Sequence, residues 1–108
     1  MSQITGGEAI VRSLESQGVE YVFGMAGHAN LAFLDPLIDS EIKFITVPHE
    51  QIAAHAADAY FRVTHKPAVV TTTAGPGATN VIAGMADALL DSSAMVVICG
   101  GIPSFYSG

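Results

Sequence analysis

The chain has 108 residues, of which 50% are apolar and 13% are charged, which is enough for one domain with a small hydrophobic core. Four lysines and arginines against ten aspartates and glutamates give a formal charge of −6, which argues against a nucleic-acid or anionic-membrane partner. The single cysteine, Cys99, provides neither a disulfide framework nor a cysteine-based metal site, and no apolar run approaches the roughly 20 residues of a membrane span, so we expect a cytoplasmic protein.

The first predicted elements are a helix, a strand and a second, short helix. Thr5 and Glu8 have the T-x-x-E spacing of a capping box, which opens a first helix that Gly18 closes. The segment "EYVF" at 20–23 is a short strand, and "GMAGHAN" is a glycine-containing turn. Asn30 can then cap the short helix "LAFLDPLID".

Strands and helices continue to alternate in the rest of the chain. The predicted order is a strand at 42–47, a helix at about 48–64, a strand at 68–73, a helix at about 78–90 and a strand at 95–99. Proline is tolerated in the first turn of the helix at 48–64, and its many alanines favour a helical conformation.

This alternation predicts parallel strands joined by right-handed crossovers, that is, an open α/β sheet with helices on both faces. The segments "AVV" and "MVVIC" are almost unbroken apolar runs, which is typical of strands buried on both faces. The final "GGIPSFYSG" is turn-like and leaves the last strand uncovered. We therefore expect the chain to be a piece of a longer protein.

Glu50 is the main candidate for chemistry. Ligands of open α/β sheets bind at the carboxyl ends of the strands, and here three of the four ends contain glycines while one, "PHE", carries an acid. In the first turn of a helix, Glu50 can be a proton-transfer group, because the helix dipole and an apolar neighbourhood act on its charge in opposite directions. From position alone, an acid in a first helical turn is most often a plain capping or dipole partner.

The histidines and the cysteine have other interpretations. We interpret three histidines as solvated or capping residues: His49, His55 and His65. His49 and His55 are six positions apart and do not share a helix face, so no metal site is predicted. His28 follows a glycine in the first turn, where it either stabilises the turn or belongs to the site. Cys99 reads as a small buried hydrophobe.

The glycine turns predict the class of ligand. Glycine turns before helices suggest a phosphate cradle, but neither "GMAGHAN" nor "AGPGATN" contains a lysine or arginine, and the nucleotide-binding glycine motifs are absent. No G-x-S-x-G segment is present to anchor a hydrolase triad. The site is therefore expected to receive a neutral or cationic ring.

Three segments together resemble a known family: "VEYVFGMAG", "HEQIAAHAADAYFRVTHKPAVVTTTAGPGATN" and "GMADALLDSSAMVVICG". They look like the N-terminal pyrimidine-binding domain of thiamine-diphosphate-dependent enzymes, the superfamily of acetolactate synthase, pyruvate oxidase, pyruvate decarboxylase and benzaldehyde lyase. The resemblance runs from about Thr5 to Gly100. It implies a flavodoxin-like, three-layer αβα fold, with residues 1–108 forming an incomplete pyrimidine-binding domain.

The resemblance implies a role for Glu50. In the family, the glutamate at this position hydrogen-bonds N1′ of the cofactor's aminopyrimidine and promotes its imino tautomer, which takes the proton from the thiazolium C2. The cofactor is the electron sink, and the protein supplies positioning and tautomer control. By the same resemblance, further residues would line the pyrimidine: Ala26, Gly27, Thr73, Gly75, Pro76, Gly77 and Asn80.

The resemblance also implies partners outside these residues. In the family, a separate domain with a G-D-G…N motif holds the diphosphate and Mg²⁺, and no such motif occurs in this chain. The implied functional unit is a homodimer or homotetramer with the active site shared between subunits, and the fragment alone is expected to be inactive. FAD is possible in such enzymes but is not indicated. The alanines at 53, 54, 56, 57 and 59 either meet another subunit or pack in the chain's own core.

Departures from the family pattern leave the subfamily open. Ala26 replaces the usual proline of the first turn, and Gly101 stands where synthases commonly have glutamine. The segment "GHANLAFLD" is instead similar to decarboxylases and lyases, which implies that His28 faces the substrate.

The predicted function is a lyase, synthase or decarboxylase for 2-keto acids, aldehydes, 2-hydroxy ketones or 2-hydroxyacyl compounds. The alternative is a non-catalytic flavodoxin-like binding or oligomerisation module.

Overall fold

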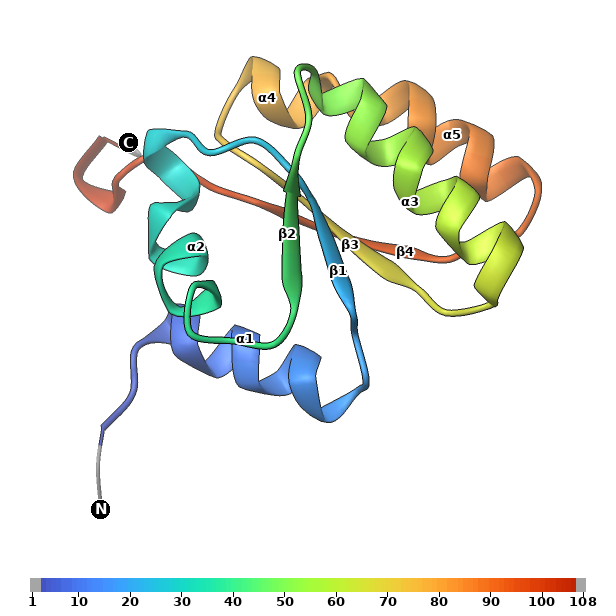
Figure 1. Ribbon diagram of the computed structural model, residues 1–108. Helices are drawn as coiled ribbons and strands as arrows, with labels where there is room; N and C mark the ends of the chain where they lie inside the picture. The colour runs from blue at the N-terminus through green and yellow to red at the C-terminus, as the bar shows by residue number, and fades with distance from the viewer. Residues whose placement is uncertain (1–2, 107–108) are drawn as a thin grey trace.

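The predicted alternation of helices and strands is present in the computed structural model, which describes residues 3–106 (Figure 1). The helices are α1 (Gly6–Ser16), α2 (Leu31–Leu37), α3 (Glu50–Thr64), α4 (Pro76–Thr79) and α5 (Ile82–Leu90). The strands are β1 (Tyr21–Gly24), β2 (Lys43–Thr46), β3 (Ala68–Thr72) and β4 (Met95–Cys99). Two short 3₁₀ turns, η1 (His28–Asn30) and η2 (Ser104–Tyr106), complete the described elements.

The four strands form one parallel sheet in the order β2-β1-β3-β4. In this register Gly24 at the end of β1 pairs with Thr46 of β2 and with Thr71 of β3. All strands therefore end at the same edge of the sheet, and the turns that follow them lie beside one another. No helix within residues 3–106 combines the length and the apolar character that crossing a membrane requires.

Helices cover both faces of the sheet, as predicted. Figure 1 shows α1 and α2 on one side of the strands and α3 and α5 on the other. The two sides have separate apolar cores. The first consists of Val11, Val22, Phe33, Leu37, Ile42 and Val69. The second consists of Val47, Ala53, Ala54, Ala57, Ala68, Val70 and Val81. The three-layer αβα fold is confirmed.

The alanines of α3 mostly serve this second core. Ala53, Ala54 and Ala57 are fully buried against the sheet and α5, whereas Ala59 is exposed and Ala56 is partly buried. Close approach explains the small side chains: a Cβ built at Gly84 of α5 would lie 2.4 Å from the Cβ of Ala54. Most of the alanines therefore pack within this chain.

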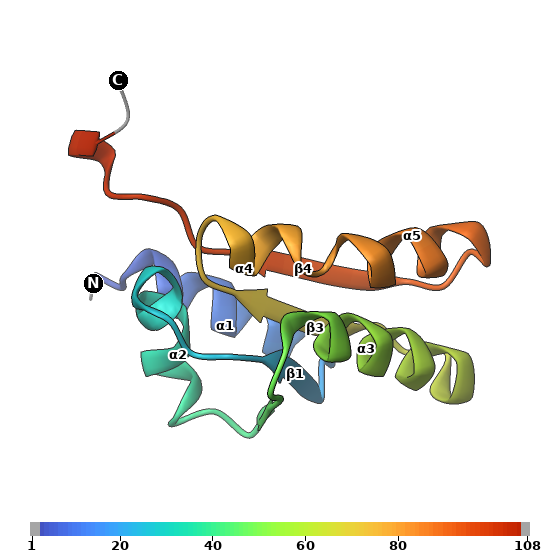
Figure 2. The same ribbon diagram turned by 90° about the horizontal axis from the view of Figure 1, so that it is seen from above.

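The prediction that both apolar strands are buried holds for β3 and is wrong for β4. Every residue of β3 is buried, but no residue of β4 is fully buried, and Cys99 at its end is exposed. β4 is the last strand of the sheet and pairs only with β3 among residues 3–106. Residues 100–106 extend away from the strands (Figure 2).

Two helix limits differ from the prediction. The helix expected from residue 48 begins at Glu50, because the backbone of His49 is extended and its Nδ1 caps the helix by accepting from the N–H of Gln51 at 3.0 Å. The helix expected at 78–90 is divided into α4 and α5. The division lies at Asn80 and Val81: the Asn80 side chain bonds to Glu50, and Val81 is buried in the second core.

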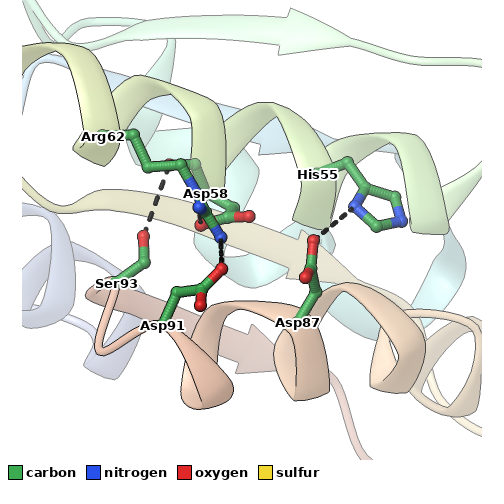
Figure 3. A network of polar contacts seen from close by, with 6 residues as sticks. All are labelled: His55, Asp58, Arg62, Asp87, Asp91 and Ser93. Carbon is green, nitrogen blue, oxygen red and sulfur yellow. Dashed lines mark hydrogen bonds and ion pairs between the residues drawn. The ribbon is translucent and has the colours of Figure 1, made fainter.

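Polar contacts join the second half of α3 to the turn that follows α5 (Figure 3). Arg62 Nε donates to Asp58 Oδ1 at 2.9 Å, and Arg62 Nη2 donates to Asp91 Oδ2 at 2.8 Å. The hydroxyl of Ser93 donates to the backbone oxygen of Asp58 at 3.3 Å. The hydrogen bond from Arg62 lowers the pKa of Asp58. The ionised pair therefore stabilises the fold above the ordinary aspartate pKa, and this stabilisation is lost as the pH falls through the lowered value.

Candidate functional site

The carboxyl ends of β1, β2 and β3 bring three segments of the chain together. These are the turn after β1, the start of α3 after β2, and the turn with α4 after β3. Figure 1 shows α4 beside the start of α3, above the strand ends. The residues proposed for the site from the sequence all lie in these segments.

Glu50 occupies the first position of α3 and is partly buried. Its carboxylate oxygen Oε1 accepts a hydrogen bond from Asn80 Nδ2 at 3.1 Å, although the two residues are 30 positions apart in the chain. The pKa of Glu50 is lowered, first by this bond, then by the backbone N–H of Glu50 itself and by the charge of His49, while burial opposes them. Glu50 is therefore a carboxylate near neutral pH, held in one orientation.

The second carboxylate oxygen of Glu50 faces a glycine. A Cβ built at Gly77 would lie 3.4 Å from Glu50 Oε2 and 2.9 Å from Cγ2 of Thr73. Gly77 is itself buried. Glycine fits here because a side chain would clash with Thr73, so backbone lies beside Oε2 while Oε1 is engaged by Asn80.

Thr73 connects the turn after β3 to the turn after β1. Its hydroxyl oxygen accepts a hydrogen bond from the N–H of Ala29 at 3.3 Å. A Cβ at Gly27 would lie 2.4 Å from the Cβ of Thr73, so a side chain at Gly27 would force the two turns apart. The structure thus brings together five of the predicted residues: Gly27, Glu50, Thr73, Gly77 and Asn80.

The other four predicted residues lie in the same turns, and none of them forms a side-chain hydrogen bond with Glu50 within residues 3–106. Gly75 has φ of +68° and precedes Pro76, the first residue of α4, and both are exposed. Ala26 is exposed and lines an apolar hollow between α2 and β2. His28 is exposed at the start of η1. These exposed positions therefore suit contact with a ligand rather than with the carboxylate of Glu50.

Asn30 has a role that the sequence did not indicate. Asn30 is the N-cap residue of α2, as predicted, but its side chain makes no cap hydrogen bond there. It is buried instead, where its Oδ1 accepts from the N–H of Gly27 at 2.8 Å and its Nδ2 donates to Met25 O at 2.9 Å and to Thr71 Oγ1 at 3.2 Å. Asn30 thereby ties the turn after β1 to β3. The G-x-x-N spacing from Gly27 to Asn30 is the sequence feature that could have indicated this role.

Replacing Asn30 by leucine should lower the free energy of unfolding by about 1–3 kcal/mol, because polar groups of the turn and of β3 lose their buried partner. Denaturant unfolding of the 108-residue chain measures the change. Gln51→Leu, which also removes an amide but at an exposed position, should stay within about 0.5 kcal/mol of the parent. Equal stability of the Asn30→Leu variant and the parent would show that the bonds of Asn30 are not needed.

No group of three or more histidines, cysteines, aspartates or glutamates that could hold a metal ion occurs within residues 3–106. The site therefore offers one carboxylate, one amide, threonine hydroxyls and open backbone.

Comparison with known protein families identifies the domain. Residues 4–108 match the model of the family described as "Thiamine pyrophosphate enzyme, N-terminal TPP binding domain". The chain belongs to this family. The resemblance stated from the sequence is therefore confirmed for this TPP-binding domain, TPP being thiamine diphosphate.

Curated relatives of this TPP-binding domain are named as acetolactate synthases. The chain is 46% identical over 103 residues to a "Probable acetolactate synthase large subunit" of Methanocaldococcus jannaschii, covering 95% of this chain and 17% of that protein. It is 48% identical over 109 residues to an "Acetolactate synthase large subunit" of Buchnera aphidicola subsp. Acyrthosiphon pisum, covering 100% and 19%. An "Acetolactate synthase" of Mycobacterium bovis is 46% identical over 103 residues, covering 94% and 17%. The chain thus spans less than a fifth of the length of these relatives.

Proposed function

We propose that the chain is the pyrimidine-binding domain of a longer thiamine-diphosphate-dependent enzyme of the acetolactate synthase type, which acts on a 2-keto acid. The names of the relatives support the synthase type, and their greater length supports further domains. The observation that carries the proposal is the carboxylate of Glu50, held by Asn80 at the carboxyl edge of the sheet.

The residues at this edge fit an aminopyrimidine ring. Glu50 offers the oxygen Oε2, which Asn80 does not bond and which lies beside the backbone of Gly77. A ring nitrogen that carries or shares a proton is a suitable partner for this oxygen. The turns themselves contain no lysine or arginine that would favour a phosphate.

The residues of this chain position the ring and control its proton. The cofactor, when bound, supplies the electron sink for breaking and forming the carbon–carbon bond. Glu50 holds a proton at the ring nitrogen N1′ and gives it up or takes it back as the reaction proceeds. Gly27, Thr73, Gly75, Pro76 and Gly77 form the wall of the ring site, and Ala26 lies at its margin.

The remaining parts of the enzyme are proposed to lie outside this chain. The diphosphate and Mg²⁺ need cationic or metal-binding groups, which the turns beside Glu50 do not provide. A second domain, supplied across a subunit interface of a homodimer or homotetramer, would hold them. The isolated chain is then expected to be inactive.

The test is made with the full-length protein, thiamine diphosphate and Mg²⁺. Cofactor-dependent release of CO₂ from pyruvate, with formation of acetolactate, would support the synthase assignment. CO₂ release with an aldehyde product, or cleavage of a 2-hydroxy ketone, would assign a decarboxylase or a lyase. Cofactor binding without any turnover would support the non-catalytic module.

His28 is proposed to face the substrate as a proton donor or acceptor, because it is exposed at the start of η1, directly after Gly27. We expect His28→Ala to lower kcat about 100-fold, in the range typical of general acid–base groups, with little change in cofactor Kd. Steady-state kinetics and cofactor titration of the full-length enzyme measure the two effects. His55→Ala, which removes an exposed histidine of α3, should change neither, and unchanged kcat in His28→Ala would exclude His28 from the site.

A further inference from the structure

Asn80 contacts the carboxylate of Glu50 from an anchored position. It is the C-cap residue of α4, and its backbone N–H donates to Pro76 O at 3.0 Å. Its side-chain Nδ2 donates to Glu50 Oε1 at 3.1 Å. Because its main chain is held in the last turn of α4, the amide reaches Glu50 from a defined direction.

The two oxygens of Glu50 therefore have different surroundings. Oε1 is bonded to Asn80, while Oε2 lies beside the backbone of Gly77. Within residues 3–106, no other side chain donates a hydrogen bond to this carboxylate. The amide of Asn80 is thus the one side chain there that selects between the charged and neutral forms of Glu50 by hydrogen bonding.

We propose that Asn80 is a positioning residue, which orients Glu50 and favours its ionised form, so that a proton shared with the pyrimidine ring resides mainly on the ring. The proposal rests on the proposed function. An amide donor stabilises a carboxylate and cannot take up the proton itself. Asparagine at this position therefore biases the shared proton without competing for it.

The other charged groups around Glu50 do not account for this bias. His49, next to it in the chain, is the one titratable group among the described residues whose charge acts on Glu50, and this effect ranks below the bond from Asn80. The elements packed on α3 carry Tyr21 on β1, Asp87 on α5 and Cys99 on β4, and none of these affects the pKa of Glu50. His49 is unchanged in every variant described below.

The test is the pH dependence of cofactor binding to the cofactor-free, full-length enzyme. Thiamine diphosphate with Mg²⁺ is titrated calorimetrically between pH 5 and 8 into the parent, Asn80→Ala, Asn80→Asp and Glu50→Gln. A plot of log Kd against pH changes slope, or bends, at the pKa of Glu50 in the cofactor-free protein, whichever partner holds the shared proton in the complex. Ionisations of the free cofactor are common to all variants and cancel in the ratio of variant Kd to parent Kd.

In Asn80→Asp, a second carboxyl group lies against Glu50 and raises its pKa, because two negative charges repel each other. The bend in the plot therefore moves to higher pH. The Kd ratio should then change with pH by about tenfold for each unit of the shift. Asn80→Ala should show a smaller change, at the acid end of the range. The matched control is Thr79→Ala, which alters the neighbouring residue of α4, whose hydroxyl bonds to Pro76 O and not to Glu50. Its Kd ratio should not depend on pH.

A Kd ratio that is independent of pH in Asn80→Asp, while the parent binds the cofactor, would overturn the role of Asn80 alone and leave the proposed function standing. A bend that persists in Glu50→Gln would assign the titration to another group and overturn it as well. Failure of the parent to bind thiamine diphosphate would overturn the proposed function, and the role of Asn80 with it.

Discussion

Replacing Glu50 by glutamine should lower the cofactor-dependent kcat of the full-length enzyme by about 10²- to 10⁴-fold, the range contributed by general acid–base groups. Glutamine has nearly the same shape, and its oxygen can still accept the hydrogen bond from Asn80. It cannot hold or exchange a proton, so the chemistry is lost while the fold is retained. Measuring CO₂ release from pyruvate at saturating cofactor separates the loss of turnover from weaker binding.

Glu8 provides a matched control for this substitution. It is the acidic residue in the first turn of α1, as Glu50 is in the first turn of α3. Glu8→Gln therefore removes a comparable favourable interaction with a helix dipole, at a distance from the strand ends. It should leave kcat unchanged. Turnover of Glu50→Gln within a few-fold of the parent would return Glu50 to the plain role of a first-turn acid.

Replacing Gly84 by alanine should destabilise the chain by about 1–3 kcal/mol, although alanine is the better helix former. The added Cβ would lie 2.4 Å from the Cβ of Ala54 and 3.2 Å from its carbonyl carbon. Backbone atoms cannot turn away as a flexible side chain can, so α5 must move off α3. Since α3 carries Glu50 at its first position, cofactor affinity of the full-length enzyme should fall as well.

The control for Gly84 is Gly6, which also lies in a helix. A Cβ at Gly6 meets no atom within 4 Å. Gly6→Ala should therefore leave the stability of the chain unchanged or slightly higher. Denaturant unfolding of both variants and the parent gives the comparison. A Gly84→Ala variant as stable as the parent would show that α3 and α5 do not need this close approach.

The fold was largely predictable because its signals are local. The limits of β4 were predicted correctly, and those of the other strands to within one residue, since apolar runs between turn residues follow directly from neighbouring positions. The division of the helix expected at 78–90 was not predicted. No glycine or proline marks it, and it depends on where Asn80 and Val81 find their partners in the folded chain.

Exposure was less predictable than conformation. "MVVIC" was expected to be buried and to hide Cys99, yet β4 is at the edge of the four-stranded sheet and Cys99 is exposed. β3 has a shorter apolar run, "AVV", followed by two threonines, and there the prediction was right. The less apolar strand is the buried one because the sheet order gives β3 two neighbouring strands and β4 one, which no pattern within a strand records.

By itself, the sequence determined the alternation of helices and strands, the family, and the position of one acid in the first turn of the helix after β2. Each of these depends on residues close together in the chain. Tertiary structure alone decided that Asn80 bonds to Glu50 over 30 residues, and that Asn30 joins its own turn to Thr71 over 41. Both contacts depend on the register of parallel strands and the path of the crossovers, which bring distant side chains to one edge of the sheet.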